Sequence, residues 1–252
     1  LRGYNLSQID LSSSLSDLLY ASFDDRTIWP LSDKMPQDFK YIEIMEFGKN
    51  PGLGVHSLHE RGITGKGVSI AIIDQPLLID HQEYRDRIQL YEEIKITYGT
   101  RAQMHGAAVA SIAVGKTVGV APSADLYYIG SRALDWGIGD LGYTYNFHYY
   151  AQAIRRLIDI NYQLADNQKI RVITMQIGWN ETQIGYDDIM DACNEARAAG
   201  MLVISSSIEA IHGFRFNGLG RKPMEDPDLF ESYEPGLFWK KYFYKNEENL
   251  SR

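Results

Sequence analysis

Two residues in the first half of the sequence combine type and position in a way that suits acid–base chemistry. Asp74 directly follows the apolar residues Ile72 and Ile73, and a carboxylate is rare in such a run unless it is paired or lies at a strand end. His105 opens a run of small residues that ends at Ala110, where few neighbours of its own helix would contact the imidazole. Each has an ordinary explanation alone: an aspartate that caps a turn, and a hydrogen-bonded histidine. Together they could supply a general base and the carboxylate that orients it.

The elements that would position this pair alternate along the chain. Apolar runs predict strands at 68–73, 124–129, 171–175 and 201–204, and helical spacing predicts helices at 105–114, 151–164 and around 189–196. A short helix from Val55 should end at Gly62, before a tight turn at 64–67. This alternation predicts an α/β fold, a parallel sheet with helices on both faces. Catalytic groups gather at the carboxyl ends of such strands, where Asp74 stands.

Composition limits the partners. The 252 residues hold 25 basic and 33 acidic side chains, a net charge of −8, without a Lys/Arg-rich stretch. This balance argues against nucleic acid or an anionic membrane as the main partner, and no apolar run is long enough for a membrane span. The single cysteine, Cys193, excludes an intramolecular disulfide and a multi-cysteine zinc site. No cofactor or metal is expected.

The segments 64–74, 105–111 and 119–126, with His81 between the first two, resemble successive landmarks of the subtilisin-like serine proteases, peptidase family S8. The resemblance spans roughly residues 50–209. It implies that Asp74 orients His105, which would deprotonate a serine nucleophile, and that the substrate is a peptide or protein. It also implies that Gln176 and Gly178 belong to the segment whose backbone pairs with the substrate peptide.

Several positions depart from the family pattern. Gln75 and Pro76 follow Asp74, where a small hydroxyl residue and glycine are usual, and Ala108 stands in place of a second histidine. Gln176 stands where serine is usual. In the simplest register Ile208 replaces the asparagine that helps to stabilise the oxyanion, although Asn217 or another group could substitute.

The nucleophile motif Gly-Thr-Ser-Met-Ala has no match, because Ser131 and the serines at 205–207 lack its context. We therefore expect a serine endopeptidase whose serine lies outside this chain, on a companion C-terminal segment, and a chain that is inactive alone. The alternative is a catalytically inactive pseudoprotease with a binding or regulatory role. A nucleotide-binding α/β domain is disfavoured, because no glycine-rich phosphate loop follows the first strand.

The predicted organisation is an N-terminal extension at 1–50 and a peptidase domain at 51–252 that lacks its serine-bearing part. Residues 213–252, rich in aromatic residues, would be an insertion whose aromatic side chains either pack on the domain or form a partner surface. The resemblance favours a secreted protein, but the chain shows no signal-peptide pattern, so its location stays open.

Overall fold

The computed structural model describes residues 1–97, 99–137, 142–205 and 219–235. The chain divides into two compact units, one of Leu1–Ser57 with Asn217–Arg252 and the other of Leu58–Phe216. These limits lie near the sequence-based boundary at 50/51 and near the start of the expected insertion at 213. Whether 1–50 acts as an extension and 213–252 as an insertion stays a prediction.

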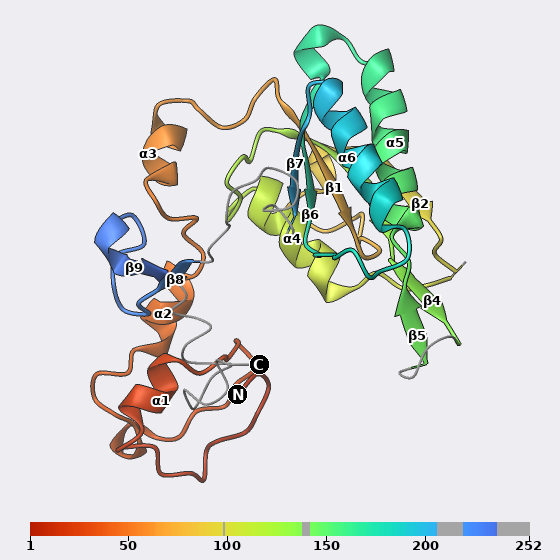
Figure 1. Cartoon of the computed structure of the whole chain (residues 1–252). Coiled ribbons are helices and arrows are strands. Elements are labelled where there is room, and N and C mark those ends of the chain that lie inside the picture. Colours follow the sequence, from red (N-terminus) through yellow and green to blue (C-terminus); the bar gives the residue numbers. More distant parts are fainter. Residues whose placement is uncertain (98, 138–141, 206–218, 236–252) are drawn as a thin grey trace. The chain divides into compact units, whose positions relative to one another are not determined.

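The second unit is built on a five-stranded parallel sheet (Figure 1). Its strands in spatial order are β2 (Ile88–Ile94), β3 (Asp125–Ser131), β1 (Ser69–Asp74), β6 (Ile170–Met175) and β7 (Leu202–Ser205). All four neighbouring pairs are parallel. The predicted α/β class is confirmed, and each of the four predicted strands appears within two residues of its expected ends.

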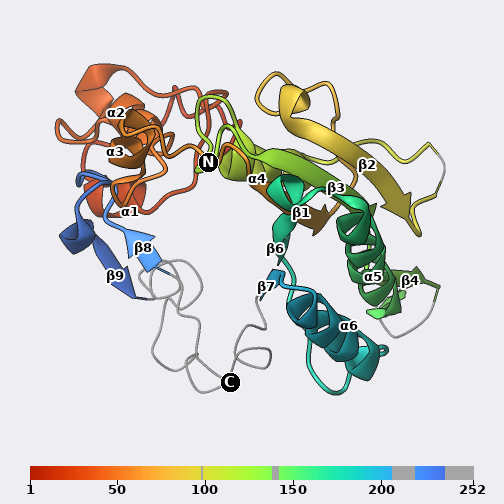
Figure 2. The same cartoon turned by 90° about the horizontal axis from the view of Figure 1, so that it is seen from above.

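Helices cover both faces of this sheet. Helix α4 (Met104–Val114) packs through Ala110 and Val114 on the face that carries Ile72. Helices α5 (His148–Gln163) and α6 (Tyr186–Ala198) lie side by side on the opposite face (Figure 2). This division follows from the alternation of side chains along β1, since adjacent residues point to opposite faces.

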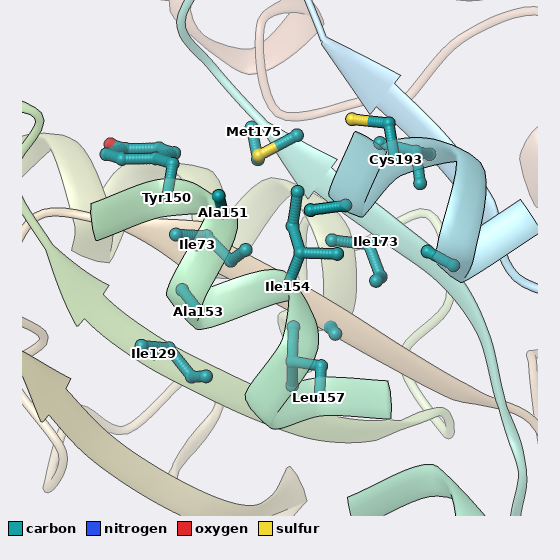
Figure 3. Close-up of a cluster of buried hydrophobic side chains, with 14 of the residues drawn as sticks. Ile73, Ile129, Tyr150, Ala151, Ala153, Ile154, Leu157, Ile173, Met175 and Cys193 are labelled. Carbon is teal, nitrogen blue, oxygen red and sulfur yellow. The ribbon is translucent and has the colours of Figure 1, made fainter. Parts of the chain in front are cut away.

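The larger core lies between the sheet and the pair α5 and α6. Figure 3 shows Ile73 and Ile173 of the sheet close to Ile154 and Leu157 of α5, with Cys193 of α6 nearby. All five side chains are fully buried. This core holds β1 from one side and thereby fixes the place where the strand ends.

Four elements of this unit differ from the sequence-based expectation. Strand β2 was not predicted, and neither was the antiparallel hairpin of β4 (Leu134–Trp136) and β5 (Tyr143–Tyr145). Helix α5 begins three residues earlier than expected, because the Asn146 side chain accepts a hydrogen bond from the His148 backbone N–H. The expected end of α6 is confirmed, since Gly200 adopts a left-handed φ of 82° just beyond it.

The first unit has a small core of its own. It contains α1 (Leu15–Leu19), α2 (Tyr41–Phe47) and the hairpin of β8 (Leu219–Arg221) with β9 (Tyr233–Pro235). Phe23, Trp29 and Phe39 pack edge to face, and Trp29 stacks on Tyr41. Residues 1–50 therefore hold more order than their polar composition suggested.

The remaining short elements complete the chain. The helix α3 (Val55–Glu60) matches its prediction, and the 3-10 turns lie at Ser32–Lys34, Arg85–Arg87, Asp166–Gln168 and Phe230–Ser232. Within the ranges that the structure describes, no helix combines the length and apolar character needed to cross a bilayer.

Candidate active site

Asp74 is the last residue of β1, the central strand of the sheet. In register it lies beside Gly130 of β3, and the residue before it lies beside Met175 of β6. Because both neighbours are parallel, the carboxyl ends of three strands meet around this carboxylate. Asp74 is only 4% exposed, so its charge needs partners.

His105 supplies one partner. It is the second residue of α4, and its Nδ1 lies 2.8 Å from Asp74 Oδ1. The same oxygen accepts a hydrogen bond from the Gln75 backbone N–H at 2.6 Å. A carboxylate only accepts, so Nδ1 carries the hydrogen and Nε2 of a neutral imidazole has a free lone pair. The His105 side chain is 46% exposed, which leaves it accessible to a reactant.

Gly106 allows α4 to come this close to the end of β1. A Cβ at this position would lie 2.7 Å from the Gln75 carbonyl oxygen and closer still to the Tyr128 hydroxyl. The helix start is also tied to the strand end by a hydrogen bond from the Gln103 N–H to the Pro76 carbonyl, 2.9 Å long. The small residue after His105 is therefore a geometric requirement of the pair.

A buried tyrosine braces the turn after Asp74. The Tyr128 hydroxyl donates a 2.6 Å hydrogen bond to the Gln75 carbonyl oxygen. Burial, together with the nearby Asp74 carboxylate, raises the pKa of Tyr128, so the hydroxyl stays protonated and remains a donor. The same two causes raise the pKa of Tyr150.

The second oxygen of Asp74 differs from the first. Oδ2 is buried, and no partner for it lies in the described part of the chain. The family pattern places a small hydroxyl residue directly after this aspartate, and Gln75 stands there instead. The Gln75 backbone N–H binds the oxygen that His105 also uses, so it leaves Oδ2 without a donor.

The predicted substrate-binding residues directly follow β6, at the same edge of the sheet. Gln176 is exposed, and its side-chain amide donates a 2.6 Å hydrogen bond to the Thr174 hydroxyl. Gly178 is half-buried. Between them, Ile177 lines a pocket that Gln75 also lines, so the segment and the residue after Asp74 share one wall.

Sequence reasoning missed this pocket. Its volume is about 290 Å³, and it extends from the ends of β1 and β6 to the β4–β5 hairpin. Its lining residues are Gln75, Gln103, Ser131, Arg132, Ala133, Leu134, Trp136, Tyr145, Tyr150 and Ile177. The aromatic residues Trp136, Tyr143 and Tyr145 were the sequence feature that could have indicated the hairpin side of this pocket.

Within the described residues, no serine takes the place of a nucleophile beside His105. Ser205 ends β7 and Ser131 ends β3, where its hydroxyl is buried. In the described ranges, no hydrogen bond joins His105 to a serine. Residues 206–209, which include Ile208, lie outside the described residues, as does Asn217.

One acidic residue at the start of α6, Asp188, forms two ion pairs. Asp188 contacts His148 Nδ1 at 2.7 Å and Arg155 Nη1 at 2.6 Å. Across the positions that are described, no group of three or more His, Cys, Asp or Glu side chains could hold a metal ion.

Comparison with known proteins places the chain in a family. The model of the Subtilase family, Peptidase_S8, matches residues 65–213, more than half of the chain. No match was found among curated proteins.

Solved structures include similar proteases. A psychrophilic protease is 24% identical, with a TM-score of 0.46 over 62% of this chain and 52% of its own. The epidermin leader peptide processing serine protease from Staphylococcus aureus is 15% identical, with a TM-score of 0.44 over 72% and 50% of the two chains. The nisin leader peptidase from Lactococcus lactis is 19% identical, with a TM-score of 0.41 over 62% and 49%. The chain thus spans about half the length of these structures.

The matched segment, 65–213, contains Asp74, His105, Gln176 and Gly178. It also contains the whole parallel sheet that brings the first two residues together. The chain belongs to the subtilase family, peptidase family S8.

Proposed function

We propose that the protein is a subtilisin-like serine endopeptidase, in which Asp74 and His105 are two members of an Asp-His-Ser triad. The serine would lie outside residues 1–252, on a further segment or a companion polypeptide. The observation that carries the proposal is the 2.8 Å hydrogen bond from His105 Nδ1 to the buried Asp74 carboxylate. This bond holds the imidazole in the tautomer that a general base needs.

The reaction follows from that tautomer. As the serine hydroxyl oxygen attacks the scissile carbonyl carbon, His105 Nε2 takes the hydroxyl proton, and Asp74 stabilises the imidazolium that forms. The imidazolium then gives this proton to the leaving amine as the peptide C–N bond breaks, which leaves an acyl-enzyme. Water, deprotonated by the same nitrogen, attacks the ester carbonyl and releases the acid and the serine.

Substrate binding would use the segment after β6. An extended peptide can pair with the backbone of residues 176–178, because main-chain groups supply the hydrogen bonds and side chains only adjust specificity. Gln176 in place of serine is compatible with this role, since its side chain is exposed and bonded to Thr174. Gly178 adds no side chain that would hinder the peptide.

The oxyanion donor is the weak part of the proposed site. If Ile208 occupies the position of the usual asparagine, the loss of that donor would lower the rate by about 100- to 1,000-fold. A slow enzyme is therefore expected, unless another donor takes its place.

The first test is the native gene beyond Arg252, or a companion polypeptide. A downstream Gly-x-Ser at a helix start supports the proposal, and a natural product that ends at Arg252 rejects it. In the intact protein, a fluorophosphonate probe should label that serine, and His105→Ala should abolish the labelling. The matched control is His148→Ala. His148 Nδ1 also lies 2.7 Å from an aspartate oxygen, Oδ2 of Asp188, but His148 is at the start of α5 and not in the proposed triad. Equal labelling of the His105 variant and the unaltered protein would contradict the assigned role.

A pseudoprotease with a binding or regulatory role is the second candidate. Gln75 and Ala108 favour it, since both depart from the family motifs. The first departure coincides with the Asp74 Oδ2 atom, for which no described residue supplies a hydrogen bond. An intact protein that binds peptides but is not labelled by the probe would support this candidate, and stoichiometric labelling would reject it.

A further inference from the structure

A second pocket adjoins the one beside Asp74. It has a volume of about 230 Å³ and is formed by the segment after β2, through Lys95 and Thr97, and by the residues that follow β3. Arg132, Leu134 and Trp136 line both pockets. The two therefore form one groove along the carboxyl ends of the strands, starting next to the Asp74–His105 pair.

Most of the charge in this groove is balanced internally. Asp135 accepts hydrogen bonds from the Tyr149 hydroxyl and from the Asn146 amide, each 2.7 Å long, one to each oxygen. These bonds, from Asn146 and then Tyr149, lower the pKa of Asp135, with a smaller contribution from Lys95. The Lys95 ammonium lies 5.0 Å from the centre of the Tyr149 ring. This carboxylate and this ammonium are thus held in a local network.

Arg132 is different. It directly follows β3, is half-buried between the buried Ser131 and Ala133, and reaches both pockets. In the part of the chain that the structure describes, its guanidinium has no hydrogen bond or ion pair. A guanidinium is always charged at neutral pH and presents a rigid fork of N–H donors. Half-buried and without a counter-charge in the described surroundings, the guanidinium is available to bind an incoming anion, and its fork matches the two oxygens of a carboxylate.

We propose that Arg132 recognises an acidic side chain, Asp or Glu, of the peptide that occupies this groove. The inference rests on the proposed function, since it takes the occupant to be a peptide held beside Asp74 and His105. Arg132 would thus be a specificity-determining residue. The preferred substrates would carry Asp or Glu close to an apolar or aromatic residue of the same peptide, which Leu134 and Trp136 would contact. The salt bridge would be partly exposed, so it should favour the acidic peptide by about 2- to 5-fold rather than by orders of magnitude.

Calorimetric titration of the 252-residue protein tests this inference without any need for catalysis. Short peptides that differ only in Glu or Gln at one position are compared, with both ends capped so that no terminal carboxylate can bind. The Glu peptide should bind about 2- to 5-fold more tightly, and the preference should shrink as salt is added. Arg132→Gln should remove the preference, and Arg132→Lys should retain part of it, because an ammonium keeps the charge but not the fork.

The control is Arg61→Gln, which removes the same charge from an exposed arginine in the segment leading into β1. This variant should keep the preference for Glu. Equal binding of the Glu and Gln peptides, or a preference that survives in Arg132→Gln, would overturn the inference and leave the proposed enzymatic function intact. Binding of neither peptide would also overturn it. Serine labelling in the intact protein tests the proposed function separately, so the two can fail independently.

Discussion

Replacing Gly106 with alanine tests whether the close approach of α4 creates the candidate site. The new Cβ would lie 2.7 Å from the Gln75 carbonyl oxygen, whereas ordinary contacts of a Cβ begin at 3.4 Å. Helix α4 would therefore have to retreat by about 1 Å, because the closest contact is with the Tyr128 hydroxyl, and Tyr128 is fully buried and cannot move aside. The same displacement at His105 would stretch its 2.8 Å bond to Asp74 to about 3.8 Å, beyond a normal hydrogen bond.

The expected change in stability follows from three effects. Overpacking costs about 1–3 kcal/mol, and a weakened bond from Tyr128 to the Gln75 carbonyl costs about 1 kcal/mol more. The higher helix propensity of alanine returns about 1 kcal/mol. We therefore expect Gly106→Ala to lower the free energy of unfolding by about 1–3 kcal/mol, and the melting temperature by about 3–10 °C.

Urea unfolding measures this free energy, and ¹⁵N NMR of the histidine ring reports whether Nδ1 of His105 keeps its hydrogen and its partner. Met104→Ala is the matched control, since Met104 lies in the same helical turn, is 71% exposed and should change neither readout. A Gly106→Ala protein as stable as the unaltered chain, with unchanged His105 signals, would refute the steric argument.

Three further predictions concern other groups. Asp74→Asn should lower peptidase activity of the intact protein by about 10⁴-fold while changing the free energy of unfolding by no more than about 1 kcal/mol; near-normal hydrolysis would contradict the proposed triad. Cys193 should resist iodoacetamide at pH 8 in the folded protein and react in urea, because burial raises the pKa of its thiol to about 12; rapid labelling of the native chain would disprove its burial. The hydrogen bond and charge of Arg156 lower the pKa of Glu92, so this pair should stabilise the fold above pH 4.5 and lose its contribution as the pH falls through the lowered pKa. With both side chains partly exposed, solvent screening should keep the contribution small, and Arg156→Gln should remove this part of the pH dependence of urea unfolding.

The sequence predicted four strands of the described sheet and missed the fifth, β2. Strands β1, β3 and β6 lie inside the sheet, where their neighbours and the covering helices favour apolar side chains. Strand β7 lies at one end of the described sheet, but Leu202, Val203 and Ile204 still form an apolar run. Strand β2 lies at the other end, and its residues are partly buried or exposed, with Glu92 and Glu93 among them. A half-exposed strand with charged residues does not produce a continuous apolar run, so the sequence pattern did not indicate a strand there.

The pairing of Asp74 with His105 was within reach of sequence reasoning because it depends on strand order and on one helix start. The environment of the second oxygen of Asp74 could not be predicted from the sequence. No described residue hydrogen-bonds this oxygen, because the Gln75 N–H points to Oδ1 instead, and that orientation depends on the backbone geometry of the turn. Arg132 was missed for a similar reason, because its significance comes from the absence of a counter-charge in the described surroundings, which only three-dimensional packing reveals.

The energetics of the Asp74–His105 pair favour a functional role over a structural one. Burying a carboxylate with one oxygen that no described residue hydrogen-bonds costs stability, and a purely structural strand end could hold a neutral residue instead. Removing the charge should cost little, because His105 is 46% exposed and would not be left as a buried, unpaired cation. The pair therefore adds little to folding. Its 2.8 Å distance nevertheless depends on a helix approach so close that only glycine fits, which makes the arrangement costly for the fold. Proton transfer at the accessible Nε2 provides a physical reason for this arrangement, whereas peptide binding alone would not require the pair.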